Sequence, residues 1–236
     1  AKIVAELMVK HPAATKLLEV LPRETGTIGL GWGITGMRVV FATRDINSPD
    51  DLKGMKIRTT GAWADILKQL GASPTVMSPG DIYTALERRV IDAAEFITPS
   101  TNLKLGYHKV AKFIIIPGVH QPSSANEIVF RGKDWDKMSA KHRSRITMAA
   151  QNSAIDTYMR LGLQDFEAMK KLRAGRNTFI TLPGDVMAKV TELARAWTAD
   201  QAKKQAAKGN MWMQKVQDSY WAFYDTYEKY SDYRVQ

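Results

Sequence analysis

The feature that most constrains this chain is an alternation of short apolar runs with helical patterns between residues 51 and 98. Two apolar runs, Met55–Arg58 and Val90–Ala94, meet charged residues at their ends, Arg58 and Glu95. Helical patterns and a third short strand, Thr75–Met77, separate them. Strands that alternate with helices are typical of a parallel sheet with right-handed crossovers, so we expect an α/β fold. Because ligands of open α/β sheets bind outside the carboxyl ends of the strands, Arg58 and Glu95 are candidate binding residues.

Local signals place the helices and the remaining strands. Apolar spacing predicts a helix over Ala62–Leu70 that ends at Gly71, and Ser78-Pro79 with Asp81 is typical of a helix start. Further strands are predicted at Thr27–Trp32, Arg38–Thr43, Phe113–Ile116, Ile128–Phe130 and Asn177–Leu182. Further helices are predicted at Lys2–Glu19, Ser139 to about Leu161, Gln164–Arg173, Asp185–Lys208 and Met211–Tyr230.

Length and composition are those of an ordinary globular protein. The 236 residues allow one large domain or two lobes, and the absence of cysteine excludes disulfides and thiolate chemistry. No run reaches the ~20 apolar residues of a membrane span. The chain begins at Ala1 without a signal-peptide core, so we expect a mature or trimmed chain.

The chain is basic, with a formal charge of +10. Nucleic acid, an anionic surface and a small anionic ligand are all compatible partners. The basic residues are spread along the sequence, and the aromatic stacking motifs of RNA-binding modules are missing. A solvated basic surface is therefore favoured over nucleic-acid binding, which would weaken steeply with salt.

A carboxylate site is suggested by Arg58-Thr59-Thr60-Gly61 just before a predicted helix. A guanidinium binds a carboxylate through two parallel hydrogen bonds, and a helix N-terminus adds free N–H groups and partial positive charge. The alternative is an arginine paired to a nearby acid, with Thr59 or Thr60 as a simple helix cap. The residues alone leave both interpretations open.

Other candidates carry weaker signals. Glu95 can be a buried acid, a metal ligand or an exposed glutamate, and Phe96 and Trp63 can line a pocket or belong to the core. The histidines, His120 among them, lack the spacing of a metal motif. The Gly31-x-Gly33-x-x-Gly36 string is followed by a strand pattern, so it is not a dinucleotide fingerprint.

The last predicted helix carries an aromatic stripe. Its apolar residues recur at spacings of three and four, which is typical of an amphipathic helix. They are Trp212, Val216, Tyr220, Phe223, Tyr227 and Tyr230. The stripe packs on its own domain or forms a dimer contact, and packing is favoured because terminal helices usually dock on their own chain.

Three segments together resemble a known family. They are DLKGMKIRTTG, LGASPTVMSPGDIYTALERRVIDAAE and LGYHKVAKFIIIPG, and the resemblance is dense from about Trp32 to Phe130. They are similar to the DctP-like substrate-binding proteins of TRAP transporters, closest to the TakP-like branch that binds 2-oxo acids. Members of this family are periplasmic receptors with two α/β lobes, not enzymes.

The resemblance implies a fold and a function. The fold would be α/β, periplasmic-binding-protein-like (class II), with a ligand cleft between two lobes. Lobe 1 would comprise residues 1–36 and 124–163, lobe 2 residues 37–123 and 164–205, and residues 206–236 a C-terminal amphipathic helix. The protein would capture a small organic carboxylate, a 2-oxo or 2-hydroxy monocarboxylate, in the periplasm. It would deliver it to sodium-driven TRAP membrane subunits, with a homodimer through the C-terminal helix as an option.

The resemblance also assigns residues. The carboxylate-clamping arginine of the family's KxR motif matches Arg58, and the arginine of its GxR strand matches Arg38. Phe96 and Trp63 would shape the pocket, and Asn126 would lie on a crossing strand near it.

A cation bridges ligand and protein in this branch. Its ligands here would be Glu95, the main chain of Phe96 and Gln121, where Gln121 replaces a family acid and so places a bound Na⁺ or Ca²⁺ in question.

Two further expectations follow. Family members begin with strand–helix units that this chain is expected to lack, so one wall of the cleft would be missing. The alternative function is an α/β enzyme that acts on a carboxylate with Glu95 as a general base. Turnover of a bound acid would distinguish that enzyme from a receptor.

Overall fold

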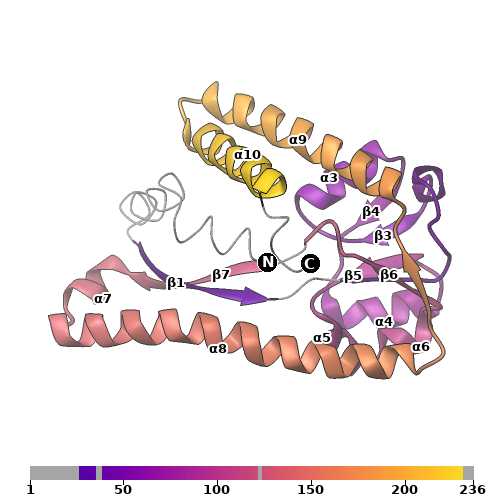
Figure 1. The fold of residues 1–236 in the computed structure, drawn as a ribbon, viewed down its shortest axis with the longest axis horizontal. Helices are drawn as coiled ribbons and strands as arrows, with labels where there is room; N and C mark the ends of the chain where they lie inside the picture. The colour runs from indigo at the N-terminus through magenta and orange to yellow at the C-terminus, as the bar shows by residue number, and fades with distance from the viewer. Residues whose placement is uncertain (1–26, 36–38, 122–123, 231–236) are drawn as a thin grey trace. The chain divides into compact units, whose positions relative to one another are not determined.

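The computed structural model describes residues 27–35, 39–121 and 124–230. The chain divides into two compact units, and the ribbon in Figure 1 shows the elements of each. Unit 1 takes residues 1–34, 124–158 and 198–236, and unit 2 takes residues 35–123 and 159–197. The lobe boundaries expected from the resemblance, and any closure of the lobes, stay predictions.

Unit 2 is built on a six-stranded sheet with the order β4-β3-β5-β2-β6-β8. Its strands are β2 (Val40–Ala42), β3 (Lys56–Arg58), β4 (Ser73–Thr75), β5 (Ala93–Glu95), β6 (Phe113–Ile116) and β8 (Thr178–Thr181). Strand β3 pairs in parallel with β4 and β5, and β6 pairs in parallel with β8. The α/β class expected from the sequence is confirmed.

The expectation of a purely parallel sheet is wrong at one strand. Strand β2 lies in the middle of the sheet and runs antiparallel to both β5 and β6. It is the first strand of this sheet along the chain, so no helical crossover from an earlier strand fixes its direction.

Helices cover both faces of this sheet. Short helices follow the strands: η1 (Pro49–Leu52), α3 (Ala62–Gln69), α4 (Pro79–Glu87), α5 (Pro99–Lys104) and α6 (Tyr107–Val110). In Figure 1, α4, α5 and α6 lie on one side of the strands and α3 lies on the other. Helix α4 begins as its sequence predicts, with Ser78 at the N-cap and Pro79 in the first turn.

The two faces of the sheet carry separate apolar clusters. The α3 cluster joins Ala42, Ile57, Ala93 and Ile115 of the strands to residues of α3 and α9 (Gly184–Ala206), among them Leu67, Val186 and Val190. The α4 cluster joins Phe41, Ala94 and Ile114 to residues of α4, α6 and α8 (Ala140–Arg173), among them Ile82, Leu86, Tyr107 and Leu172. Because successive strand residues point to opposite faces, Ile114 and Ile115 belong to different clusters.

Unit 1 contains a two-stranded sheet of β1 (Thr27–Thr35) and β7 (Ser124–Arg131) and the short helix α7 (Gly132–Asp136). Helices α8 (Ala140–Arg173) and α9 (Gly184–Ala206) contribute to both units, and α10 (Trp212–Tyr230) belongs to unit 1. Trp135 and Ala150 form a small apolar cluster in this unit. On α10, the indole N–H of Trp221 donates to Thr198 Oγ1 over 3.3 Å.

Several predicted boundaries are corrected. The two helices expected on either side of Gly162 are one continuous helix, α8. A single glycine inside a helix costs only about 1 kcal/mol, which 33 other residues offset. Strand β4 begins two residues before the predicted Thr75–Met77, and β5 is Ala93–Glu95, since Val90 lies in the turn after helix α4. The predicted helix Lys2–Glu19 lies outside the described residues.

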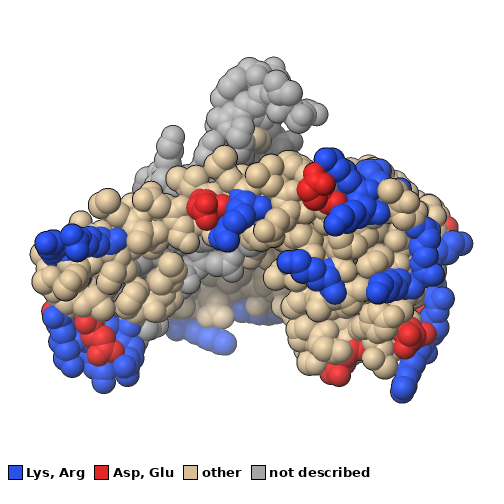
Figure 2. Space-filling model, turned by 90° about the horizontal axis from the view of Figure 1, so that it is seen from below, with Lys and Arg blue, Asp and Glu red and all other residues tan. Residues whose placement is uncertain are grey.

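Two surface properties bear on the expected class of protein. On the face shown in Figure 2, Lys and Arg stand in several separate groups, with Asp and Glu among them. Within the described ranges, no helix combines the length and the apolar character needed to cross a membrane.

Candidate functional site

The candidate site lies at the carboxyl ends of two neighbouring strands in unit 2. Strands β3 and β5 are parallel, with Arg58 in register with Ala94. Arg58 ends β3 and Glu95 ends β5, so both residues lie at the same edge of the sheet. The pairing predicted from two charged strand ends is therefore present.

Arg58 is buried and held by main-chain carbonyls. Its side chain is only 7% exposed. Nη1 donates to the Glu95 carbonyl over 2.9 Å, and Nε and Nη2 both donate to the Met77 carbonyl over 3.3 Å. The guanidinium also lies over the ring of Phe96, 5.5 Å from its centroid. Three of the five guanidinium N–H groups are thus engaged by carbonyls in the described chain, and the others can donate elsewhere.

Glu95 is buried against Arg58. Its side chain is 3% exposed, and Oε1 lies 3.5 Å from Arg58 Nη1. The hydroxyl of Thr59 donates to the same oxygen over 3.1 Å. The interpretation of Glu95 as an exposed glutamate is therefore wrong, and so is that of Thr59 as a simple cap, because Gly61 is the N-cap of α3. The alternative of an arginine paired to a nearby acid describes this contact.

His120 joins this group, and the sequence analysis did not select it. Its side chain is 3% exposed, and Nε2 lies 3.5 Å from Glu95 Oε2. The ring stacks on Trp63 with centroids 5.4 Å apart and planes 24° apart. Within the described residues, neither ring nitrogen has a hydrogen-bond partner. The signal was its position two residues after Gly118, beyond the Pro117-Gly118 turn that closes a buried strand, not its spacing to other histidines.

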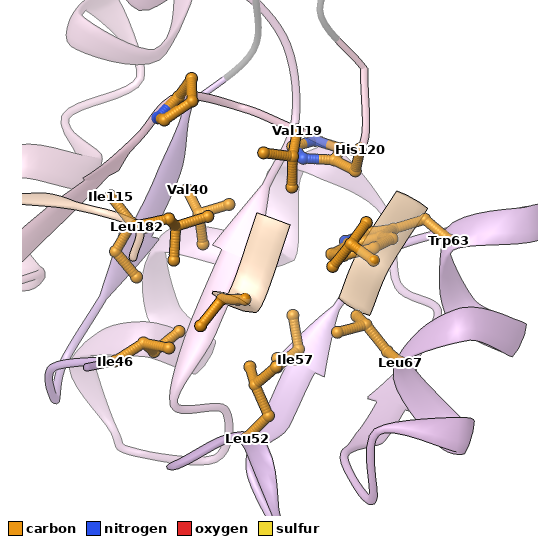
Figure 3. Close-up of a pocket in the computed structure, with 13 residues that line it drawn as sticks. Val40, Ile46, Leu52, Ile57, Trp63, Leu67, Ile115, Val119, His120 and Leu182 are labelled. Carbon is orange, nitrogen blue, oxygen red and sulfur yellow. The ribbon is translucent and has the colours of Figure 1, made fainter. Parts of the chain in front are cut away.

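His120 and Trp63 line a cavity on the α3 side of the sheet. Its volume is about 40 Å³. Figure 3 shows the lining side chains converging from β2, β3, β6, α3 and the segment after β6. Apart from His120, the wall is apolar: Val40, Ile46, Leu52, Ile57, Trp63, Leu67, Ile115, Pro117, Val119, Leu182, Val186 and Val190.

The other predicted site residues have different outcomes. Gln121 follows His120, is partly buried, and its main-chain N–H donates to Gly118 over 3.0 Å. Arg38 lies outside the described residues. Asn126 lies on β7 in unit 1, and its side chain is outside the described part. The roles of these three residues in ligand binding stay predictions.

Tyr107 is buried close enough to Arg58 to feel its charge. Burial raises the pKa of its hydroxyl, and the positive charge of Arg58 opposes that rise. The hydroxyl donates to the Pro79 carbonyl over 3.3 Å. Tyr107 is therefore neutral at ordinary pH and ties α6 to the start of α4.

The expected cation can be compared with the donors that are present. Among the residues that the structure describes, no three or more His, Asp or Glu side chains are grouped to hold a metal ion. Of the ligands that the resemblance implies, Glu95 would supply one carboxylate, with Arg58 beside it, and Gln121 would supply a neutral amide. Calcium sites usually gather six to eight oxygens, several of them from carboxylates. Cation binding by Glu95 and Gln121 stays a prediction.

Comparisons with known proteins agree with this architecture. The model of the bacterial extracellular solute-binding proteins of family 7 (DctP) matches residues 2–205. A monocarboxylate 2-oxoacid-binding periplasmic protein from Nostoc is 27% identical over 164 residues, which are 70% of this chain and 45% of that protein. The chain thus spans about half the length of this curated relative.

Two solved structures of TRAP periplasmic solute binding proteins are similar over 99% of this chain and 70% of theirs. The protein from Pseudoalteromonas atlantica, with bound sodium and pyruvate, is 25% identical with a TM-score of 0.86. The protein from Colwellia psychrerythraea, with bound calcium and pyruvate, is 23% identical with a TM-score of 0.89. The second likeness speaks to the fold alone.

The family match covers most of the chain and agrees with the family resemblance of the sequence. The expected periplasmic location agrees with the family's description as extracellular and with the name of the Nostoc relative. The expectation of a bridging cation agrees with the sodium bound in the Pseudoalteromonas structure. The chain belongs to the bacterial extracellular solute-binding proteins of family 7.

Proposed function

We propose that this protein is a periplasmic receptor for a small organic carboxylate. The ligand would be a 2-oxo or 2-hydroxy monocarboxylate, and the protein would deliver it to the membrane subunits of a sodium-driven TRAP transporter. The family membership supports the receptor role. The name of the Nostoc relative and the pyruvate in the Pseudoalteromonas structure support the ligand class.

The observation that carries this proposal is the buried guanidinium of Arg58. Its orientation is fixed by the carbonyls of Met77 and Glu95, so little side-chain freedom remains to be lost when a ligand binds. Its other N–H groups can donate to the two oxygens of a ligand carboxylate. Removal from water strengthens that attraction, because the effective dielectric constant falls.

The proposed receptor role differs from catalysis in what Glu95 does. Its carboxylate is contacted by Thr59 and Arg58, which hold it in place at the strand end. We therefore give Glu95 a positioning role for Arg58 and a contact with the ligand or a weakly held cation. The alternative enzyme would consume a bound acid, whereas the receptor would release it unchanged.

The test is isothermal titration calorimetry with a panel of carboxylates, each with and without Na⁺ and Ca²⁺. We expect binding of 2-oxo or 2-hydroxy monocarboxylates and little dependence on calcium. A ligand at a hundred times its dissociation constant should stabilise the fold by about 2.7 kcal/mol, which raises the melting temperature by a few degrees. Nuclear magnetic resonance of the recovered ligand checks for turnover. Absence of binding to every acid would refute the proposal.

The expected homodimer through the C-terminal helix stays a proposal. In unit 1, α10 contacts α9 through Trp221, the residue after Tyr220 of the stripe: its indole N–H donates to Thr198 Oγ1. Tyr230, at the end of the stripe, is 59% exposed. Light scattering of the purified chain distinguishes a monomer, which packing alone predicts, from a dimer.

A further inference from the structure

We propose that His120 and the cavity beside it form the subsite for the end of the ligand that does not carry the carboxylate. His120 would bond the 2-oxo or 2-hydroxy oxygen, and a short aliphatic group would occupy the cavity. This inference rests on the proposed function, since Arg58 must hold the carboxylate. It adds a recognition residue and narrows the ligand to monocarboxylic acids with a small apolar tail.

The imidazole of His120 is buried without a hydrogen bond to the described residues. Its side chain is 3% exposed, and within the described residues neither ring nitrogen has a hydrogen-bond partner, although Nε2 lies 3.5 Å from Glu95 Oε2. A polar group that is buried unpaired costs free energy, and such groups in native proteins often serve a function. A ligand oxygen that bonds this ring would remove the cost, so His120 favours ligands that carry such an oxygen.

The ring of His120 is held in place by its neighbours. Trp63 stacks on it with planes 24° apart, and Glu95 Oε2 lies 3.5 Å from Nε2. A neutral imidazole donates from one nitrogen and accepts at the other. The same fixed ring can therefore bond a keto oxygen, which only accepts, or a hydroxyl, which does both.

His120 and Arg58 both lie next to the carboxylate of Glu95. The Glu95 carboxylate contacts both residues, with Oε1 3.5 Å from Arg58 Nη1 and Oε2 3.5 Å from His120 Nε2. One carboxylate group thus separates the guanidinium from the imidazole. In a 2-oxo or 2-hydroxy acid the second oxygen sits on the carbon next to the carboxylate, so one small ligand offers an oxygen to each of the two groups.

The cavity beside His120 is small and mostly apolar. A volume of about 40 Å³ holds roughly three water-sized groups. The wall around it is aliphatic, with Val40 from β2, Ile57 from β3 and Ile115 from β6. Burying a second carboxylate or several hydroxyls against such a wall is unfavourable. The cavity therefore favours a tail of two to four carbons and disfavours dicarboxylates and sugar acids.

The experiment compares matched acids by calorimetry on the intact chain. Butyrate, 2-oxobutyrate, 2-hydroxybutyrate, pyruvate, 2-oxoisovalerate, 2-oxoglutarate and glucuronate are titrated. We expect 2-oxobutyrate to bind at least about tenfold more tightly than butyrate, because only the first satisfies the imidazole. We expect 2-oxoglutarate and glucuronate to bind more weakly than 2-oxobutyrate.

Variants separate recognition from structure. His120→Phe should bring the affinity ratio of 2-oxobutyrate to butyrate close to one, while His120→Gln, which keeps a donor and an acceptor, should retain part of it. Val119→Leu narrows the cavity, so it should weaken 2-oxoisovalerate more than pyruvate. His108→Gln is the control, since His108 also has a buried unpartnered nitrogen but lies away from the cavity lining.

The outcomes separate this inference from the proposed function. If acids bind in the wild-type protein and Arg58 variants lose them, but His120→Phe leaves the ratio unchanged, the subsite is refuted and the receptor stands. Equal binding of butyrate and 2-oxobutyrate by the wild-type protein also refutes the subsite, even if His120→Phe does not fold. If no acid binds at all, both ideas fail.

Discussion

The two faces of the six-stranded sheet differ in how completely they are packed. On the α4 side, Phe41, Ile82 and Leu86 have no exposed surface. On the α3 side, the apolar cluster surrounds a cavity whose wall includes the buried imidazole of His120. Close packing maximises stability, whereas an open space beside an unpaired polar group lowers it. From this difference we infer that the α4 face stabilises the unit and that the α3 face keeps room for a ligand.

Arg58 and Glu95 link these two faces at the strand ends. Phe96, under the guanidinium, packs with the α4 cluster, while Glu95 is in register with Val40 of the cavity wall. The residues that would bind the carboxylate thus rest on the packed face, next to the open one. Variants in which stability and ligand choice are measured separately test whether the two faces differ in this way.

The largest effect is expected from breaking the buried ion pair. Arg58→Met leaves Glu95 buried without its cationic partner, which should cost about 3–5 kcal/mol of unfolding free energy. The double variant Arg58→Met with Glu95→Gln removes both charges and should recover most of that loss. Neither variant should bind carboxylates. Urea unfolding and calorimetry measure the two properties.

Recovery of binding by the double variant would show that Arg58 acts only as the partner of Glu95. Equal stability of the single and double variants would mean that the pair contributes no more than two exposed charges. Either result would contradict the view that the Arg58–Glu95 pair serves both stability and carboxylate binding.

Neighbouring residues on β6 test the comparison directly. Ile114 packs in the α4 cluster and Ile115 in the α3 cluster, where it also lines the cavity. Ile114→Ala should cost about 2–5 kcal/mol and leave the choice among bound acids unchanged. Ile115→Ala should cost less, because part of its surface already faces a void, and should favour acids with longer tails.

The measurements are urea unfolding of both variants and titration with pyruvate and 2-oxoisovalerate. Equal stability losses, together with unchanged ligand ratios in Ile115→Ala, would mean that the two faces are packed alike. The cavity would then be an ordinary packing defect and not a ligand subsite.

A smaller effect is expected where α8 meets α5 in unit 2. Asp165 on α8 is 8% exposed and accepts a hydrogen bond from the main-chain N–H of Ser100 over 2.8 Å. It thereby satisfies a donor in the first turn of α5 that would otherwise lack a partner. Asp165→Ala should cost about 1.5–3 kcal/mol, the value of a bond to a charged group. Glu167→Gln on the exposed side is the control, and urea midpoints that match in the two variants would contradict this role.

Much of the fold follows from local sequence signals. Ser78-Pro79 predicted the start of α4, and the apolar runs predicted β3 and β6 to within one residue. The direction of β2 was not predictable, because antiparallel pairing in mid-sheet depends on where the chain enters the sheet. The continuity of α8 through Gly162 depends on the summed helix preference of a long segment rather than on one residue.

Local sequence signals also predicted part of the site. Arg58 and Glu95 stand at strand ends, and parallel pairing brings such ends together. His120 follows a turn, so its approach to Glu95 and Trp63 depends on tertiary packing that no periodicity records. Thr59 looked like a helix cap because its hydroxyl can serve either role, and only the fold shows Glu95 within reach.

The smallest effect concerns pH and His108, a partly buried histidine of α6. Burial, Lys109 and Arg176 lower the pKa of His108 below its ordinary value of 6.5. Between that lowered pKa and pH 6.5 the unfolded chain binds more protons than the folded chain, so the His108 contribution to stability is complete above pH 6.5 and declines as the pH falls. Urea midpoints at pH 7.5 and 5.5 should therefore fall further in the wild-type protein than in His108→Gln. Equal declines would mean that His108 does not contribute, and a changed ratio of 2-oxobutyrate to butyrate affinity in this variant would mean that acid selection is not confined to the cavity face.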